Sequence, residues 1–142
     1  LEDEPTSPQI QHFASPLGAH LALLTALYHH NDILAVAAKG GLIGYLSILD
    51  NPFSYIPPDI IIPEILETGD INDICAHLAP KPLWIEGFVD GRNFLAEQTK
   101  LESTMGRVRE AYQKNGDLAN LMIRKESPES ELVSWLIHVL KD

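Results

Sequence analysis

Apolar residues follow two different patterns along this chain. Residues 33–38 are apolar throughout, which is typical of a strand covered on both faces. Residues 10–14, 83–87 and 118–123 are further strand candidates. Helical spacing of apolar residues predicts helices over 16–28, 42–49, 71–78, 94–114 and from 127 onward. This alternation predicts an α/β fold, a three-layer sandwich with about four parallel strands flanked by helices.

Local signals mark several helix ends. Ser15 and Ser127 each precede a proline, an arrangement that favours a serine cap followed by proline at the first helical position. Asp70 is the expected cap of the helix over 71–78, and Asn115 with the following glycine is the expected stop of the helix over 94–114. Prolines interrupt residues 51–63, which we expect to form a long excursion.

The length of 142 residues indicates one domain. Residues 1–8 are acidic and contain prolines, so we expect a flexible tail there and an ordered domain over 9–142. No apolar run reaches the roughly 18–20 residues that a membrane-spanning helix requires. The chain begins at Leu1 without a signal-peptide pattern, which is consistent with a processed or truncated start and leaves the cellular compartment open.

Charge and cysteine content exclude several classes of site. The formal net charge of -10 disfavours nucleic acids and anionic membranes as partners. A single cysteine, Cys75, excludes an intrachain disulfide and cysteine-cluster metal sites. His29 and His30 are adjacent on a predicted helix end and point in different directions, so we expect no metal there. We expect no cofactor.

One region of the sequence resembles a known family. The segment IPEILETGDINDI (residues 62–74) followed by LAPKPLWI (residues 78–85) is similar to the acetyl xylan esterase and dienelactone hydrolase-like group of α/β-hydrolases. In that group, a helix leads through an Ala-Pro-Arg-Pro turn into the strand that carries the catalytic acid. The likeness extends over residues 10–140 and corresponds to the C-terminal half of the fold. It implies a nucleophile at Ser15, an acid at Asp90 and a small carboxylic ester as substrate.

The sequence departs from the family pattern at two catalytic positions. Phe13 and Leu17 stand where the nucleophile elbow has glycines, and the loop at 124–128, where the family has its histidine, contains none. His138 follows well inside the last predicted helix, too far along to reach the strand ends. The resemblance therefore implies a hydrolase-like domain with a degenerate or incomplete triad.

Other interpretations of these residues remain open. Ser15 is also explained as an ordinary helix cap, and Asp90, followed by glycine, as a turn residue. His12, His20 and His77 are isolated and are expected to be packing or surface residues. The chain is then a non-catalytic interaction or structural module, or the C-terminal part of a larger hydrolase. Because a half-sheet exposes an edge, we expect self-association or packing against an upstream segment.

Overall fold

The computed structural model describes residues 16–115 and 117–141. Its described strands form one parallel sheet in the order β1-β2-β3. These strands are β1 (Val36–Lys39), β2 (Leu83–Glu86) and β3 (Leu121–Arg124). The α/β class and the parallel sheet are thus confirmed with three strands, while the fourth candidate, residues 10–14, lies outside the described residues.

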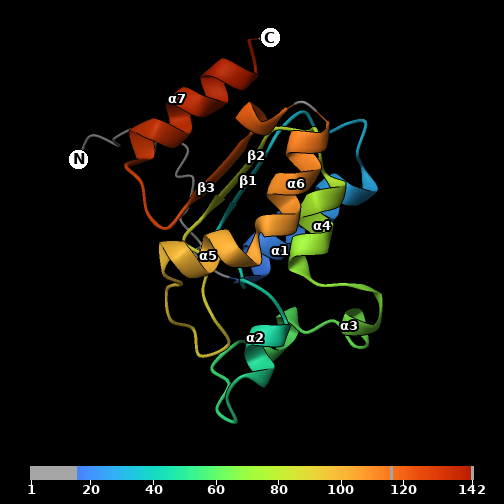
Figure 1. Ribbon diagram of the computed structural model, residues 1–142, viewed down its shortest axis with the longest axis vertical. Helices are drawn as coiled ribbons and strands as arrows, with labels where there is room; N and C mark the ends of the chain where they lie inside the picture. The colour runs from blue at the N-terminus through green and yellow to red at the C-terminus, as the bar shows by residue number, and fades with distance from the viewer. Residues whose placement is uncertain (1–15, 116, 142) are drawn as a thin grey trace, which may run out of the picture.

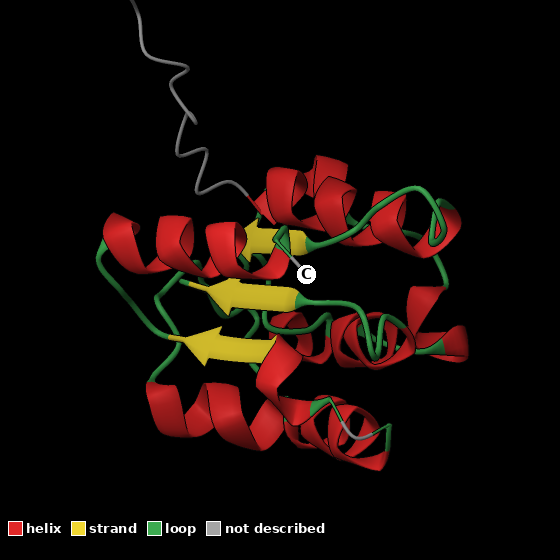
Figure 2. Cartoon of the chain, turned by 90° about the horizontal axis from the view of Figure 1, so that it is seen from above, coloured by secondary structure: helices red, strands yellow, loops and turns green. Residues whose placement is uncertain are grey.

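Helices cover both faces of the sheet (Figures 1 and 2). One face packs against α1 (Pro16–Tyr28), α4 (Ile71–His77) and α6 (Gly106–Lys114). The opposite face packs against α7 (Glu129–Val139). The remaining elements are two short helices, α2 (Leu46–Leu49) and α3 (Ile65–Thr68), the helix α5 (Gln98–Thr104), and two 3-10 turns, Pro58–Ile60 and Leu118–Asn120. None of the described helices has the length and apolar character needed to cross a bilayer.

The alternation of side chains along the strands separates the two cores. In register, Val36, Leu83 and Leu121 point into the larger core, as do Ala38, Ile85 and Ile123 one pleat further on. Trp84 faces the other side, where its ring lies 5.5 Å from the ring of Trp135 on α7. Each strand is therefore covered on both faces, which explains the nearly continuous apolar sequence of residues 33–38.

Two predicted helices are shorter than their apolar spacing suggested. Only Leu46–Leu49 of the expected helix over 42–49 is helical, because Leu42 forms a parallel bridge to Val89 beyond the sheet. The expected helix over 94–114 is two helices, α5 and α6, separated at the buried Met105. Its first residues are extended because Leu95 forms an antiparallel bridge with Val89.

The start of the last helix also differs from the prediction. Pro128, not Ser127, is the N-cap residue, and the helix begins at Glu129. No polar group of the described residues pairs with the hydroxyl of Ser127, whose backbone N–H instead donates to Glu86. The Ser-Pro pattern located the helix correctly, but a contact with the sheet determined where the chain turns into it.

Candidate functional site

The loops that follow the strands meet at the carboxyl edge of the sheet, where ligands of open α/β sheets bind. Gly40 and Gly87 follow β1 and β2 with φ angles of 71° and 66°, in the left-handed region that favours glycine. Beyond them, the N–H of Ile43 donates to the Val89 carbonyl (2.8 Å), and the N–H of Val89 donates to the Gly41 carbonyl (2.8 Å). The loops after β1 and β2 are therefore hydrogen-bonded to each other and form one continuous surface.

Asp90, the predicted acid, lies on this surface and is occupied by its own turn. Its Oδ1 accepts hydrogen bonds from the N–H groups of Arg92 (2.9 Å) and Phe94 (3.0 Å). Its Oδ2 lies 3.9 Å from Nε of Arg92. These contacts agree with the interpretation of Asp90 as a turn residue.

The predicted nucleophile, Ser15, lies outside the described residues, as does His12. Helix α1 begins directly after Ser15, at Pro16. Its first turn lies at the carboxyl edge, because a Cβ on Gly41 would come within 2.9 Å of Cβ of Ala19. The structure thus places the start of α1 and Asp90 at the same edge of the sheet.

The loop after β3 is held by contacts of its own. The N–H of Lys125 donates to Oε1 of Gln98 (2.8 Å), and its ammonium group pairs with Glu97 (2.9 Å). The loop's residues, 124–128, include no histidine. His138 lies in the last turn of α7, about 13 Å along the helix axis from Glu129 at a rise of 1.5 Å per residue.

Glu86, at the end of β2, is a buried carboxylate that the sequence analysis did not identify. Its side chain accepts hydrogen bonds from Nε1 of Trp84 (2.8 Å) and from the N–H of Ser127 (3.2 Å), and it lies 3.3 Å from the ammonium group of Lys39. A buried carboxylate is tolerated when it is paired and hydrogen-bonded in this way. Glu86 therefore joins β1, β2 and the start of α7 and is closed to a ligand.

Asp70 connects two helix starts. It caps α4 as predicted, with its Oδ1 accepting from the N–H of Ile71 (2.7 Å). Its carboxylate also accepts from the N–H groups of Tyr45 (2.7 Å) and Leu46 (3.2 Å) at the start of α2. Gly44 permits this approach, since a Cβ there would lie 2.9 Å from Oδ2 of Asp70. The position of Asp70 directly before the helix predicted over 71–78 indicated that it caps α4. No local pattern indicated that it also binds the start of α2.

His20 is buried in the first helix. Its Nδ1 lies 2.6 Å from the carbonyl of Pro16, which makes Nδ1 the donor and leaves Nε2 as an acceptor without a partner among the described residues. The ring meets that of Tyr45 edge-on, with centroids 5.6 Å apart. Burial lowers the pKa of His20, and this effect exceeds the opposing influences of the Pro16 carbonyl and the Asp70 carboxylate.

The lowered pKa of His20 predicts a loss of stability in mild acid. In the unfolded chain the imidazole binds a proton near its ordinary pKa of 6.5, whereas the folded state resists protonation. The free energy of unfolding is therefore unaffected by His20 protonation well above pH 6.5, and it decreases as the pH falls below 6.5. We expect His20→Gln to flatten the dependence of Tm on pH between 7.5 and 5.5.

His77 provides a matched control for this experiment. Its Nδ1 lies 2.7 Å from the carbonyl of Asp73, the same spacing of four residues, but its side chain is exposed. His77→Gln should leave the dependence of Tm on pH unchanged. Equal slopes for the wild type and His20→Gln would show that His20 is not the titrating group.

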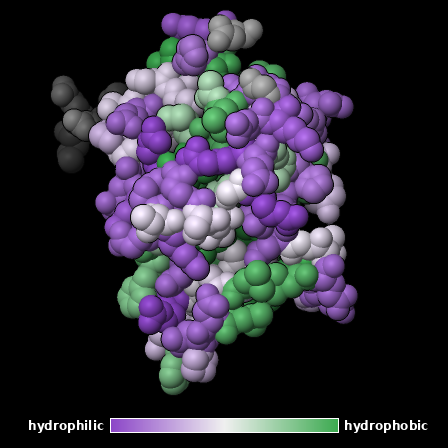
Figure 3. Space-filling view, viewed as in Figure 1, coloured by the Kyte–Doolittle hydropathy of each residue, from purple (hydrophilic) through white to green (hydrophobic). Residues whose placement is uncertain are grey.

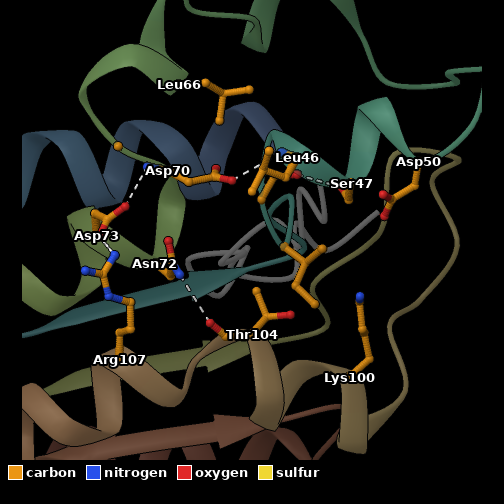
Figure 4. A pocket seen from close by; sticks show the side chains of 13 residues that line it. Leu46, Ser47, Asp50, Leu66, Asp70, Asn72, Asp73, Lys100, Thr104 and Arg107 are labelled. Carbon is orange, nitrogen blue, oxygen red and sulfur yellow. Dashed lines mark hydrogen bonds and ion pairs between the residues drawn. The ribbon is translucent and has the colours of Figure 1, made fainter.

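Two adjoining hollows open at the carboxyl edge. The first, of about 430 Å³, lies between α2, α4, α5 and the start of α6, and the second, of about 480 Å³, lies beside the Asp90 turn. Both are lined by Ser47, Asp50 and Lys100, and we call them together the carboxyl-edge cleft. Figure 4 shows the first hollow, with Asp70 at its inner wall.

The described part of the chain contains neither a reactive thiol nor a cluster of metal ligands. Burial raises the pKa of the Cys75 thiol to about 12, so at neutral pH it is protonated and a poor nucleophile. Across residues 16–115 and 117–141, no three His, Cys, Asp or Glu side chains are placed to hold a metal ion. The cleft is therefore the candidate site.

Comparisons with known proteins identify no relative. No family model, no curated protein and no solved structure matches this chain.

Proposed function

We propose that this chain is an α/β-hydrolase-type domain, akin to the C-terminal half of carboxylic ester hydrolases, that has lost ester hydrolysis and keeps a ligand cleft. The parallel sheet, the start of α1 at its carboxyl edge and the Asp90 turn beyond β2 support the kinship. The resemblance of residues 62–74 and 78–85 to the esterase group supplies the reaction class.

The loop at 124–128, which contains no histidine, carries the proposal that hydrolysis is lost. A triad acid orients an imidazole by accepting its Nδ1–H, and the base then takes a proton from the nucleophile. In this chain Oδ1 of Asp90 accepts from two backbone N–H groups of its own turn, and Oδ2 lies 3.9 Å from Nε of Arg92. The loop at 124–128 presents the Lys125 ammonium group, already paired with Glu97, in place of an imidazole. A serine without a base is a weak nucleophile at neutral pH.

Hydrolysis of p-nitrophenyl acetate tests this proposal. We expect the wild type, Ser15→Ala and Asp90→Asn to release p-nitrophenol at one rate, because neither side chain assists the reaction. Asparagine keeps an acceptor oxygen for the turn, so the second variant should retain its fold. Ser103→Ala, on the exposed side of α5, is the control for nonspecific effects.

A clear loss of rate in Ser15→Ala, absent in Ser103→Ala, would contradict the proposal and establish an active serine. A matching loss in Asp90→Asn would add the acid to that mechanism.

A non-catalytic interaction module is the second candidate. Large apolar side chains remain exposed at the end of α1, just before β1, and at the end of α7, among them Tyr28, Leu34, Ile137 and Leu140. Exposed apolar area of this kind is typical of surfaces that pack against other protein. A second copy of the chain or additional upstream sequence would cover it, as the kinship with one half of a larger fold implies.

A further inference from the structure

Lys100 is an uncompensated cation in the carboxyl-edge cleft. Arg107 pairs with Asp73 (2.9 Å), but the ammonium group of Lys100 makes no hydrogen bond or ion pair with any residue of 16–115 or 117–141. Its ammonium group points across the first hollow towards Ser47 and Asp50 (Figure 4). Within the described residues that line this hollow, Lys100 is thus the positive charge available to a ligand.

The acids around Lys100 are mostly neutralised by other groups. Three backbone N–H groups bind the Asp70 carboxylate, and Arg107 pairs with Asp73. Asp50 has no such partner among the described residues and faces Lys100 from the opposite wall. The balance of one available cation against one opposing acid favours a ligand with a single negative charge over a polyanion.

An apolar groove begins beside this polar end. Leu46 and Leu66 line the first hollow, and Leu66 also lines a neighbouring groove of about 310 Å³ between α2 and the segment leading into α3. The groove is walled mainly by apolar side chains: Ile48, Leu49, Ile61, Ile62 and Ile65. Leu49 is 71% exposed and Ile61 48% exposed, and Figure 3 shows the resulting apolar region over α2 and towards α3.

We propose that the cleft and groove together bind a straight-chain aliphatic carboxylate. The carboxylate lies against Lys100, and the chain passes over Leu46 and Leu66 into the groove. This inference names a ligand class for the proposed function. It rests on that function in one respect: among ligands with one negative charge we choose a carboxylate, because a carboxylic acid is the product of ester hydrolysis.

The charge of Lys100 determines which ligand head is bound, and burial of the aliphatic chain determines how the affinity increases with chain length. The Lys100 ammonium attracts a carboxylate head, and Asp50 on the opposite wall reduces this attraction. Each methylene removed from water contributes roughly 0.8 kcal/mol, which is about fourfold in affinity. Glu64 and Glu67 border the groove, so a negatively charged chain end is disfavoured there.

Titration of the whole chain with hexanoate, followed by heteronuclear NMR, tests the proposal. Acetate and hexylamine serve as comparison ligands. We expect hexanoate to bind at least about tenfold more tightly than acetate, because its four additional methylenes are partly buried. Hexylamine should bind much more weakly, and the shifted amides should belong to α2, α3 and α5.

Four variants locate the two ends of the ligand. Lys100→Met should weaken hexanoate at least about fivefold, whereas Lys114→Met, at the exposed end of α6, should not. Asp50→Asn should tighten hexanoate about threefold by removing the opposing charge. Leu66→Ser should weaken hexanoate and leave acetate unchanged.

Three outcomes would overturn the proposal: equal affinity for acetate and hexanoate, undiminished binding to Lys100→Met, or equal binding of hexylamine. Failure to bind any of the three ligands would overturn it as well. Because no ester is present, these results are independent of the p-nitrophenyl acetate assay that decides whether hydrolysis is lost.

Discussion

Replacing Gly91 by alanine is expected to lower the free energy of unfolding by about 3 kcal/mol, an overpacking cost at the upper end of its usual range. A Cβ on Gly91 would lie 2.5 Å from the carbonyl oxygen of Ser47 and 2.6 Å from Cα of Ile48. Both are backbone atoms of α2 and cannot rotate aside. The loop after β2 would therefore separate from α2, and the hydrogen bond from Tyr55 N–H to the Gly91 carbonyl (3.2 Å) would be lost.

Chemical denaturation measures this effect, with Gly106→Ala as the matched control. A Cβ on Gly106 meets no described heavy atom within 4 Å, and the residue begins α6. The control should therefore be neutral or stabilising by about 0.5–1 kcal/mol through the unfolded state. Equal denaturation midpoints for Gly91→Ala and the wild type would show that the loop and α2 do not pack as described.

Replacing Asp70 by alanine is the second large effect, with an expected loss of about 3–4 kcal/mol. The substitution leaves the N–H groups of Tyr45, Leu46 and Ile71 without their acceptor in a largely buried site. Each unsatisfied donor costs about 1–3 kcal/mol, and water entering the site offsets part of that sum. Because these donors start two helices, α2 and α4 should loosen together.

Equilibrium denaturation with hydrogen exchange at Tyr45 and Leu46 measures this result. Asp73→Ala is the control, since its carboxylate accepts from the Asp70 N–H (2.9 Å) and pairs with the exposed Arg107, and its loss should cost about 1 kcal/mol. If Asp70→Ala costs no more than Asp73→Ala, or if the amides of α2 remain protected, Asp70 does not connect the two helices.

Asp70 and Gly91 both support the wall of the carboxyl-edge cleft. Asp70 holds the start of α2, and Gly91 allows the loop after β2 to lie against the same helix. Ser47 and Asp50, which line both hollows, belong to α2 or follow it directly. Both substitutions should therefore also weaken hexanoate binding, although neither residue belongs to the proposed contacts with the ligand.

Part of the candidate site was predictable from the sequence. The Asp90 turn was one of two interpretations of Asp90-Gly91, and its contacts lie within four residues. Lys100 was not identified, because a lone lysine in a predicted helix has no distinctive spacing. Glu86 was missed because the strand pattern of residues 83–87 emphasised apolar positions, although its period of two places Glu86 on the same face as Trp84.

The sequence by itself determined the alternation of the three strands with helices, the parallel α/β class and the start of α4, because these depend on apolar periodicity and on contacts within about four residues. Only the tertiary structure decided where the helices predicted over 42–49 and 94–114 begin, since Leu42 and Leu95 both form bridges with Val89. It also decided that Asp70 reaches α2 and that Glu86 receives Lys39 and the N–H of Ser127. Apart from Leu95 and Val89, which are six residues apart, these pairs are separated by 25 to 47 residues, and such contacts arise only when packing brings distant strands and helices to one edge.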